Sequence, residues 1–232
     1  MLVENYNRVR REIDEACKRV GRDPKDVLLV AVSKTKPLSD IEELVAAGVN
    51  DFGENKVQEL CQKYDEVSKP VNFHQIGHLQ TNKVKQVIGK ACLIHSVDSF
   101  HLAEKIEAEA AKKDIAVDVL LEVNVAEEES KFGLTTENVE ELVRSIASEL
   151  PHVKIQGLMT IAPFVADPEE NRPVFRKLHQ LLLDIKSKNI DNVDMCLLSM
   201  GMTNDYKVAV EEGATHVRVG TAIFGARDYS NR

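Results

Sequence analysis

The sequence predicts an α/β protein in which eight parallel strands close into a single (β/α)8 TIM barrel. Eight short apolar segments alternate with helical segments at a spacing of about thirty residues, a pattern typical of a parallel sheet covered by helices. Polar residues gather where these apolar segments end, which is where barrels carry their chemistry. An open doubly wound sheet is the alternative. No linker interrupts the pattern, so we expect one domain over residues 1–232.

The first predicted strand, residues 27–33, is the clearest. Six apolar residues run from Val27 to Val32 without a polar break, and Pro37 marks the turn that follows. Such a run, rich in valine and leucine, is typical of a strand that is buried on both faces. The other predicted strands cover residues 49–53, 73–77, 92–97, 117–124, 154–161, 195–200 and 216–220. The fifth strand of the set, residues 117–124, is broken by Asp118 and Glu122.

Helices are predicted before and between these strands. Residues 2–21 carry Val9, Ile13, Cys17 and Val20 at helical spacing, and Gly21 is suited to end the helix. Further helices are expected over residues 39–47, 54–67, 81–88, 99–113, 136–148, 169–188 and 205–212. A short final helix is expected over residues 221–226.

Composition and charge exclude several classes of protein. The 232 residues are 43% hydrophobic, and the net charge of −8 disfavours binding to nucleic acid or to anionic membranes. No apolar run is long enough to span a bilayer, and the charged N-terminal segment lacks the apolar core of a signal peptide. Cys17, Cys61, Cys92 and Cys196 are scattered, as expected of reduced thiols. We therefore expect a cytoplasmic monomer that binds neither nucleic acid nor membrane.

Lys34 lies at the carboxyl end of the first predicted strand. Burying a charged lysine there costs free energy unless the lysine is paired with an acid, is neutral or forms a covalent bond with a ligand. Desolvation lowers the pKa of a lysine, which can then form a Schiff base with an aldehyde near neutral pH. The alternative is that Lys34 extends its head group to water and pairs with a carboxylate. This segment alone leaves both interpretations open.

The ends of the last two strands carry Ser199, Gly201, Gly220 and Thr221. Barrels often bind phosphate with the loops after strands seven and eight, where glycines let backbone N–H groups approach and hydroxyls donate. Ordinary turns between strand and helix are the alternative. Taken with a buried lysine across the barrel, these residues favour a ligand that carries both an aldehyde and a phosphate.

Pyridoxal 5′-phosphate (PLP) is such a ligand, and it also needs a partner for its ring nitrogen. Arg218 is the candidate at a strand end, although a buried structural ion pair is the alternative. A guanidinium is always charged and only donates. It would therefore keep the pyridine nitrogen unprotonated and weaken the ring as an electron sink.

Other candidates are less specific. Asn55 is suited either to contact the cofactor or to cap the following helix. His74 and His78 are four residues apart, but a strand end and a loop separate them, which argues against a metal site. Lys36 and Lys131 are either additional amines near the site or solvated loop lysines.

Six motifs together resemble a known family. They are residues 31–36 (AVSKTK), 52–55 (FGEN), 74–77 (HQIG), 157–160 (GLMT), 198–202 (LSMGM) and 217–225 (VRVGTAIFG). These motifs closely resemble the pyridoxal-phosphate homeostasis proteins, also called proline synthetase co-transcribed homologues. One departure is residues 203–205 (TND), where the family often has Ser-Asp-Asp.

The resemblance implies a barrel like the N-terminal domain of alanine racemase, with PLP bound through Lys34. It also implies phosphate contacts at Ser199, Gly201, Gly220 and Thr221, with Arg218 at the ring nitrogen. Racemases of this type use a C-terminal β domain and a tyrosine from a partner subunit as the second acid–base group. The sequence printed here runs to Arg232, and we expect no such domain; its tyrosines lie in predicted helices or the tail: Tyr6, Tyr64, Tyr206 and Tyr229.

We therefore expect a non-enzymatic PLP-binding protein acting in vitamin B6 homeostasis. It would hold the cofactor as an internal aldimine on Lys34 and help to buffer it or to deliver it to apo PLP-enzymes. A PLP-dependent amino-acid racemase or related enzyme, with Lys34 as its single base, is the first alternative. A class I aldolase that uses Lys34 on a phosphorylated sugar is the second.

Overall fold

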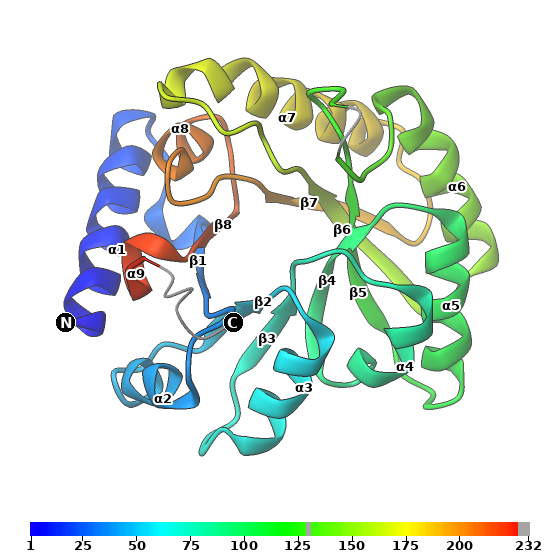
Figure 1. The fold of residues 1–232 in the computed structure, drawn as a ribbon. Coiled ribbons are helices and arrows are strands. Elements are labelled where there is room, and N and C mark those ends of the chain that lie inside the picture. Colours follow the sequence, from blue (N-terminus) through cyan, green and yellow to red (C-terminus); the bar gives the residue numbers. More distant parts are fainter. Residues whose placement is uncertain (129–130, 227–232) are drawn as a thin grey trace.

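The strands of the protein form one closed parallel barrel (Figure 1). The structure is a computed structural model and describes residues 1–128 and 131–226. The strands are β1 (Leu28–Val32), β2 (Asp51–Glu54), β3 (Asn72–Gln75), β4 (Ala91–Val97), β5 (Val117–Glu122), β6 (Val153–Met159), β7 (Val193–Ser199) and β8 (His216–Val219). They pair in chain order, and β8 pairs with β1. The predicted (β/α)8 barrel is confirmed, and the open sheet is wrong because it has no such closing pair.

Helices surround the barrel (Figure 1). They are α1 (Leu2–Arg19), α2 (Leu38–Ala46), α3 (Val57–Glu66), α4 (Val84–Val87), α5 (Phe100–Ala111), α6 (Val139–Glu149), α7 (Arg172–Ser187), α8 (Tyr206–Glu211) and α9 (Thr221–Phe224). Short 3-10 turns cover Pro24–Asp26, Thr81–Lys83, Thr136–Asn138 and Pro168–Asn171. The helix predicted from residue 54 begins instead at Val57, because Glu54 still belongs to β2 and pairs with Gln75 of β3.

Most of the hydrophobic core lies between the barrel and its helices. On β8, Val217 and Val219 belong to this outer core and are fully buried. Side chains of a strand point alternately to opposite faces, so His216 and Arg218 point into the barrel. A separate, small apolar cluster made of Leu93, Leu120, Met159 and the partly buried Leu197 accompanies this inner face. The burial of both faces explains why the strands read as nearly continuous apolar runs.

The interior of the barrel also holds buried polar residues. His74, His95, Ser199 and Arg218 are each at most 4% exposed and are joined by hydrogen bonds between strands. The sequence pattern did not predict this interior, because these polar residues are distributed over several strands that are distant in sequence. The polar layer becomes visible only when the strands are aligned in register.

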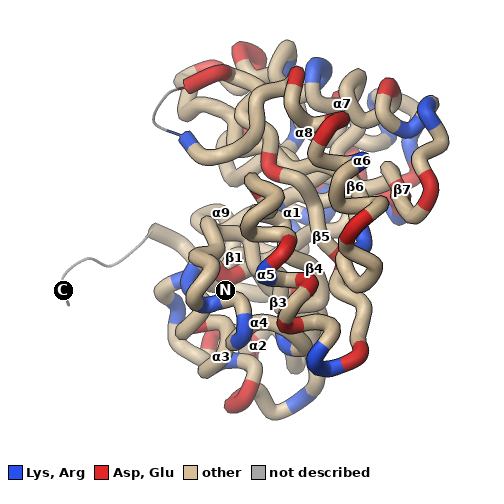
Figure 2. The backbone as a smooth tube through the Cα atoms, turned by 90° about the vertical axis from the view of Figure 1, so that its right-hand side faces the viewer, with Lys and Arg blue, Asp and Glu red and all other residues tan. Residues whose placement is uncertain are grey.

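Acidic and basic residues are mixed over the outer surface rather than separated (Figure 2). The four cysteines are free, as predicted, with Cys17 buried and Cys92 and Cys196 exposed. Among the described residues, no helix combines the length and the apolar character that crossing a membrane requires.

Gly157 of β6 is the tightest point between neighbouring strands. A Cβ atom placed there would lie 1.9 Å from the carbonyl oxygen of Leu197 on β7. We expect Gly157→Ala to lower the free energy of unfolding by about 3 kcal/mol, since overpacking must displace backbone. Chemical denaturation measures this loss. The control is Gly48→Ala, where a Cβ atom meets nothing within 4 Å and only the left-handed backbone costs about 1 kcal/mol. Equal losses for the two variants would contradict the prediction.

Candidate functional site

Lys34 lies in the turn that joins β1 to α2. Ser33 before it is fully buried, whereas Lys34 is half-buried and Thr35 after it is exposed. The turn closes through a hydrogen bond from the Lys36 N–H to the Ser33 carbonyl oxygen (3.0 Å), and Thr35 adopts a left-handed conformation with φ of 65°. The position agrees with the prediction of a lysine where a buried strand emerges.

A buried carboxylate on β2 holds the start of this turn. Glu54 is fully buried, and its Oε1 atom accepts hydrogen bonds from the Ser33 hydroxyl (2.6 Å) and from the Lys63 ammonium (2.7 Å). Burial raises the pKa of Glu54, while Lys63 and Ser33 oppose that effect. Its second oxygen, Oε2, is buried and has no hydrogen-bond partner among the described residues.

Helix α3 supplies two further residues of this support, Glu59 and Lys63. We call these two residues together with Glu54 the α3 clamp. Lys63 also donates to the Ser33 carbonyl oxygen (2.8 Å), and Glu59 accepts from the Thr35 N–H (2.7 Å). The clamp thus binds the residues on both sides of Lys34. Sequence reasoning missed Lys63, although its spacing from Val57 and Leu60 puts it on the buried face of the helix.

The candidate phosphate residues lie on strands adjacent to Lys34 rather than across the barrel. Ser199 ends β7, which pairs with β8, and Gly220 and Thr221 directly follow β8. Strand β8 in turn pairs with β1, with Ala31 opposite Val219. The sequence interpretation of a lysine across the barrel is therefore wrong: in a closed barrel, the first and last strands are neighbours.

The two glycines of this set are required by close packing. At Gly201, where φ is 90°, a Cβ atom would lie 2.5 Å from the Cβ atom of Ala209 on α8. At Gly220, a Cβ atom would lie 3.3 Å from the carbonyl oxygen of Val32 on β1. Both glycines therefore bring neighbouring elements together, and Gly220 brings the end of β8 against the end of β1.

Arg218 places a guanidinium inside the barrel, where it is 4% exposed. It donates to the Ser199 hydroxyl and to the carbonyl oxygen of Thr160 (2.8 Å). Burial lowers the pKa of Arg218 to about 10, while Glu122 and Asp205 act in the opposite sense. The group therefore remains a cation at neutral pH and has two fixed acceptors.

Glu122, at the end of β5, is a second buried ionisable group that the sequence analysis did not select. Burial, helped by the charge of Asp98, raises the pKa of Glu122 to about 7, while Arg218 opposes the shift. Its carboxyl group therefore exchanges protons near neutral pH. The only indication in the sequence was its interruption of an apolar strand.

A row of imidazoles continues from Ser199 through the barrel interior. The Ser199 hydroxyl lies 2.8 Å from His95 Nδ1, and His95 Nε2 lies 3.0 Å from His74 Nδ1. His74 Nε2 lies 3.3 Å from Asp51 Oδ1. His74 is thus an interior residue rather than one at the barrel opening. No group of three or more potential metal ligands is found among the described residues.

The remaining candidates occupy different positions around the opening. Asn55 is half-buried and does not cap α3, whose N-cap is Lys56. Lys36 donates to the carbonyl oxygens of Phe224 (2.9 Å) and Ala226 (3.2 Å), so it joins the turn after β1 to the segment after β8. Lys131 is exposed in the loop after β5.

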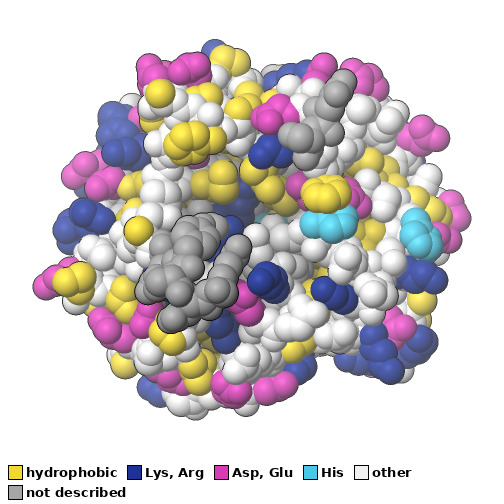
Figure 3. Space-filling view, viewed as in Figure 1, with side chains coloured by type: hydrophobic (Ala, Val, Ile, Leu, Met, Phe, Trp, Pro, Cys, Tyr) yellow, Lys and Arg dark blue, Asp and Glu magenta, His cyan; other side chains and the backbone are white. Residues whose placement is uncertain are grey.

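Seen along the barrel, this face of the molecule is hollowed near its middle, with basic side chains in and around the hollow (Figure 3). The loops that follow β3 and β5 meet where the rings of His78 and Phe132 stack with centroids 4.0 Å apart. The basic side chains in and around this hollow favour an anionic ligand.

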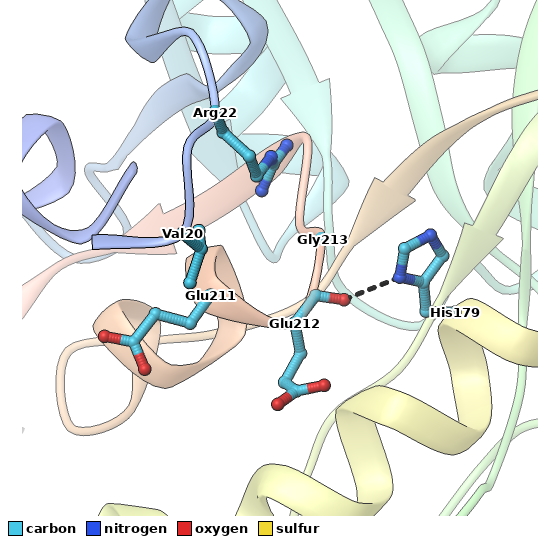
Figure 4. Close-up of a pocket in the computed structure, with 6 residues that line it drawn as sticks. All are labelled: Val20, Arg22, His179, Glu211, Glu212 and Gly213. Carbon is cyan, nitrogen blue, oxygen red and sulfur yellow. Dashed lines mark hydrogen bonds between the residues drawn. The ribbon is translucent and has the colours of Figure 1, made fainter. Parts of the chain in front are cut away.

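Another pocket lies outside the barrel, beside α8 (Figure 4). It is lined by Val20, Arg22, His179, Glu211, Glu212 and Gly213. The carboxylates of Glu211 and Glu212 are paired with Arg172 (2.7 and 2.9 Å), and His179 donates to the Glu212 carbonyl oxygen (2.8 Å). These polar groups already have partners, so we do not assign the functional site to this pocket.

Comparison with known proteins agrees with this geometry. The family model described as the alanine racemase N-terminal domain matches residues 5–228. A pyridoxal phosphate homeostasis protein of Aquifex aeolicus is 47% identical over 227 residues, which cover 97% of this chain and 98% of that protein. The chain belongs to the pyridoxal phosphate homeostasis protein family. The family resemblance predicted from the six motifs is therefore confirmed.

Other members of the pyridoxal phosphate homeostasis protein family are similar over the same length. The Escherichia coli protein of that name is 36% identical, covering 100% of this chain and 99% of its own. PipY of Synechococcus elongatus, solved with PLP bound, is 33% identical with a TM-score of 0.80, covering 92% of this chain and 100% of PipY. An alanine racemase of Clostridium difficile shares only the fold, at 13% identity and a TM-score of 0.74 over 99% of this chain and 58% of that one.

We expect the protein to lose stability when the buried ion pair of the α3 clamp is broken. Lys63→Met leaves the Glu54 carboxyl group buried without its cation, and we expect a loss of about 3 kcal/mol in the free energy of unfolding. Adding Glu54→Gln to this variant removes the stranded charge and should recover about half of the loss. Chemical denaturation measures both effects. Lys56→Met, at an exposed position of the same segment, is the matched control. The clamp would be refuted if Lys63→Met were no more destabilising than this control.

Proposed function

We propose that this protein is a non-enzymatic PLP-binding protein of vitamin B6 homeostasis, with the cofactor held as an internal aldimine on Lys34. The observation that carries the proposal is the arrangement of three consecutive strands. Strand β7 ends in Ser199, β8 carries Arg218 and leads to Gly220, and β1 leads to Lys34. A hydroxyl, a guanidinium, a close glycine turn and a primary amine thus belong to one side of the opening.

Each of these groups suits one part of the cofactor. The Lys34 amine condenses with the aldehyde carbon and releases water, which leaves an imine. The phosphate is assigned to the turns that contain Gly201, Gly220 and Thr221, together with Ser199. Asn55, from the turn after β2, is assigned to the same ligand. PLP supplies an aldehyde and a conjugated ring that absorbs visible light.

The position of Arg218 favours storage of the cofactor over catalysis. A buried guanidinium donates to the pyridine nitrogen and does not protonate it. The ring then withdraws electrons weakly, so a carbanion next to the imine is poorly stabilised.

Racemases use a tyrosine as the second acid–base group. None of the tyrosines that the structure describes lies at the end of a strand, where such a group would be expected. Tyr6 lies on α1, Tyr64 on α3 and Tyr206 on α8. The hydroxyl of Tyr206 donates to Glu12, and burial together with that hydrogen bond raises its pKa. Tyr229 lies outside the described residues. Two-sided proton transfer therefore lacks its usual partner in this part of the chain.

We further propose that the protein acts as a cytoplasmic monomer that passes PLP to apo PLP-enzymes. The support for transfer is the supply of amines near the site, since imine exchange between amines moves an aldehyde without free intermediates. Lys36 and Lys131 are the amines proposed for this step.

Lys34→Ala is expected to abolish the visible absorbance band of the bound cofactor, because that band belongs to the conjugated imine. Absorbance spectra before and after borohydride treatment measure the effect. The exposed Lys25 precedes the opposite end of β1, and Lys25→Ala should leave the band unchanged. A Lys34→Ala variant with the full wild-type band would refute the assignment of Lys34. A wild-type protein that is colourless after incubation with PLP and removal of the unbound cofactor would refute the proposed function.

The wild-type protein is expected to exchange the α-hydrogen of alanine with deuterated solvent far more slowly than about one event per second, an ordinary enzymatic rate. The weak electron sink and the lack of a suitably placed tyrosine among the described residues are the physical reasons. Proton NMR of alanine incubated with the PLP-loaded protein measures this exchange. Exchange at that rate or faster would make the protein a racemase-type enzyme.

A further inference from the structure

We propose that His95 and His74 are positioning residues for the cofactor site. They belong to a one-way chain of hydrogen bonds that runs from Arg218 through Ser199, His95 and His74 to Asp51. The chain holds the Ser199 hydroxyl and the Arg218 guanidinium in fixed orientations. Its connection with a ligand rests on the proposed function, whereas the chain itself is a property of the protein alone.

The contacts form an unbroken path across the barrel. From Arg218 Nη1 the path reaches the Ser199 hydroxyl, then His95 Nδ1 (2.8 Å), and then from His95 Nε2 to His74 Nδ1 (3.0 Å). It ends at Asp51 Oδ1, 3.3 Å from His74 Nε2. These residues belong to β8, β7, β4, β3 and β2. The path therefore connects five of the eight strands through side chains.

The two ends of the path determine its direction. Arg218 can only donate, so Ser199 accepts from it. At the other end, Asn72 donates to Asp51 Oδ1 (2.9 Å), the same oxygen that faces His74 Nε2, and the pKa of Asp51 lies below its usual value despite burial. Asp51 is therefore a carboxylate that only accepts, and His74 Nε2 carries the hydrogen.

The interior hydrogens follow from these ends. Burial lowers the pKa of His95 well below its usual value, so its ring is neutral and carries one hydrogen. The proposal places a single hydrogen on the His74 ring, at Nε2, so that His74 Nδ1 accepts and His95 Nε2–H donates to it. His95 Nδ1 then accepts the hydroxyl hydrogen of Ser199. Both rings are thus predicted to be neutral Nε2–H tautomers.

The direction of the chain decides whether Ser199 can donate a hydrogen bond to the cofactor phosphate. Its single hydrogen is used inward, toward His95, and one of its lone pairs is used by Arg218. Ser199 therefore serves the cofactor by holding the guanidinium, and the hydrogen-bond donors to a phosphate come from the turns at Gly201, Gly220 and Thr221. A chain in the opposite direction would free the Ser199 hydrogen, but it needs an additional proton on His74 or on Asp51.

Nitrogen-15 NMR of the histidine rings tests the direction of the chain without any cofactor. Full-length protein should show neutral Nε2–H tautomers for His74 and His95, with resonances assigned from His74→Gln and His95→Gln. A cationic His74 or an Nδ1–H His95 would overturn the proposal.

Asp51→Ala removes the terminal acceptor and should make Nδ1–H the major tautomer of His95, because only the reversed chain then leaves no ring hydrogen unpaired. Asp118, an exposed carboxylate on β5 that accepts from Gln156 (2.8 Å), provides the control Asp118→Ala, which should change neither ring. Unchanged tautomers in Asp51→Ala would show that the chain does not set them.

The effect on the site is tested with a second pair of variants. His216 is also a buried interior histidine and packs against the rings of His95 and His74 (centroids 6.0 and 6.1 Å away), but its Nδ1 atom contacts the Thr215 hydroxyl outside the chain. His95→Leu should weaken PLP binding by about tenfold or more, whereas His216→Leu should change it by less than about threefold. Both variants make the same chemical change, so a general packing effect would weaken PLP binding equally in both.

Absorbance titration with PLP and thermal unfolding of the cofactor-free variants separate binding from stability. The proposal is supported if the two variants lose similar stability and only His95→Leu loses affinity. Equal losses of affinity, or none in His95→Leu, would overturn it. A wild-type protein that fails to bind PLP would refute the proposed function instead, and the ring tautomers would still decide whether the chain exists.

Discussion

The buried guanidinium of Arg218 is the constraint on which the interior of the barrel depends. A charge removed from water is strongly destabilising unless nearby groups replace its hydration. Ser199 and the Thr160 carbonyl oxygen provide that replacement, and Glu122 contributes an opposing charge nearby. Because these residues come from β7, β5 and the end of β6, one cation on β8 determines the polarity of several strands. The acceptor hydroxyl in turn needs a fixed orientation, which the imidazole row supplies.

The barrel tolerates polar residues in its interior because most of the hydrophobic stabilisation comes from the core between the strands and the helices. The large core lies between the strands and the surrounding helices, and the apolar cluster assigned to the inner face is small. Burial of apolar area outside the barrel stabilises the fold regardless of what lies within it. The inward positions of the strands can therefore carry ionisable groups without loss of the architecture, which explains how one barrel supports a ligand site.

These two layers also explain what the sequence could predict. The run from Val27 to Val32 and the spacing of eight such runs were sufficient for the barrel, since most outward positions of the strands are apolar. Lys34 and Gly220 were found because they follow strands, where polar residues are readily noticed. His95 and Lys63 were missed for the opposite reason: each lies inside an element, His95 within β4 and Lys63 on the buried face of α3. Their partners, Ser199 and Glu54, are distant in sequence, so only the register of the folded barrel reveals them.

The pairing of β8 with β1, which closes the barrel, determines what surrounds the Lys34 turn. The turn at Lys34 is held on one side by the α3 clamp and on the other by Lys36, which binds carbonyl oxygens at the end of α9. Thr35 between them adopts a left-handed conformation that costs a non-glycine residue about 1 kcal/mol. A turn fixed from two sides in this conformation holds the backbone at Lys34 in one place. The proposed cofactor would therefore be bound to a backbone position that elements on both sides of the closing strand pair determine.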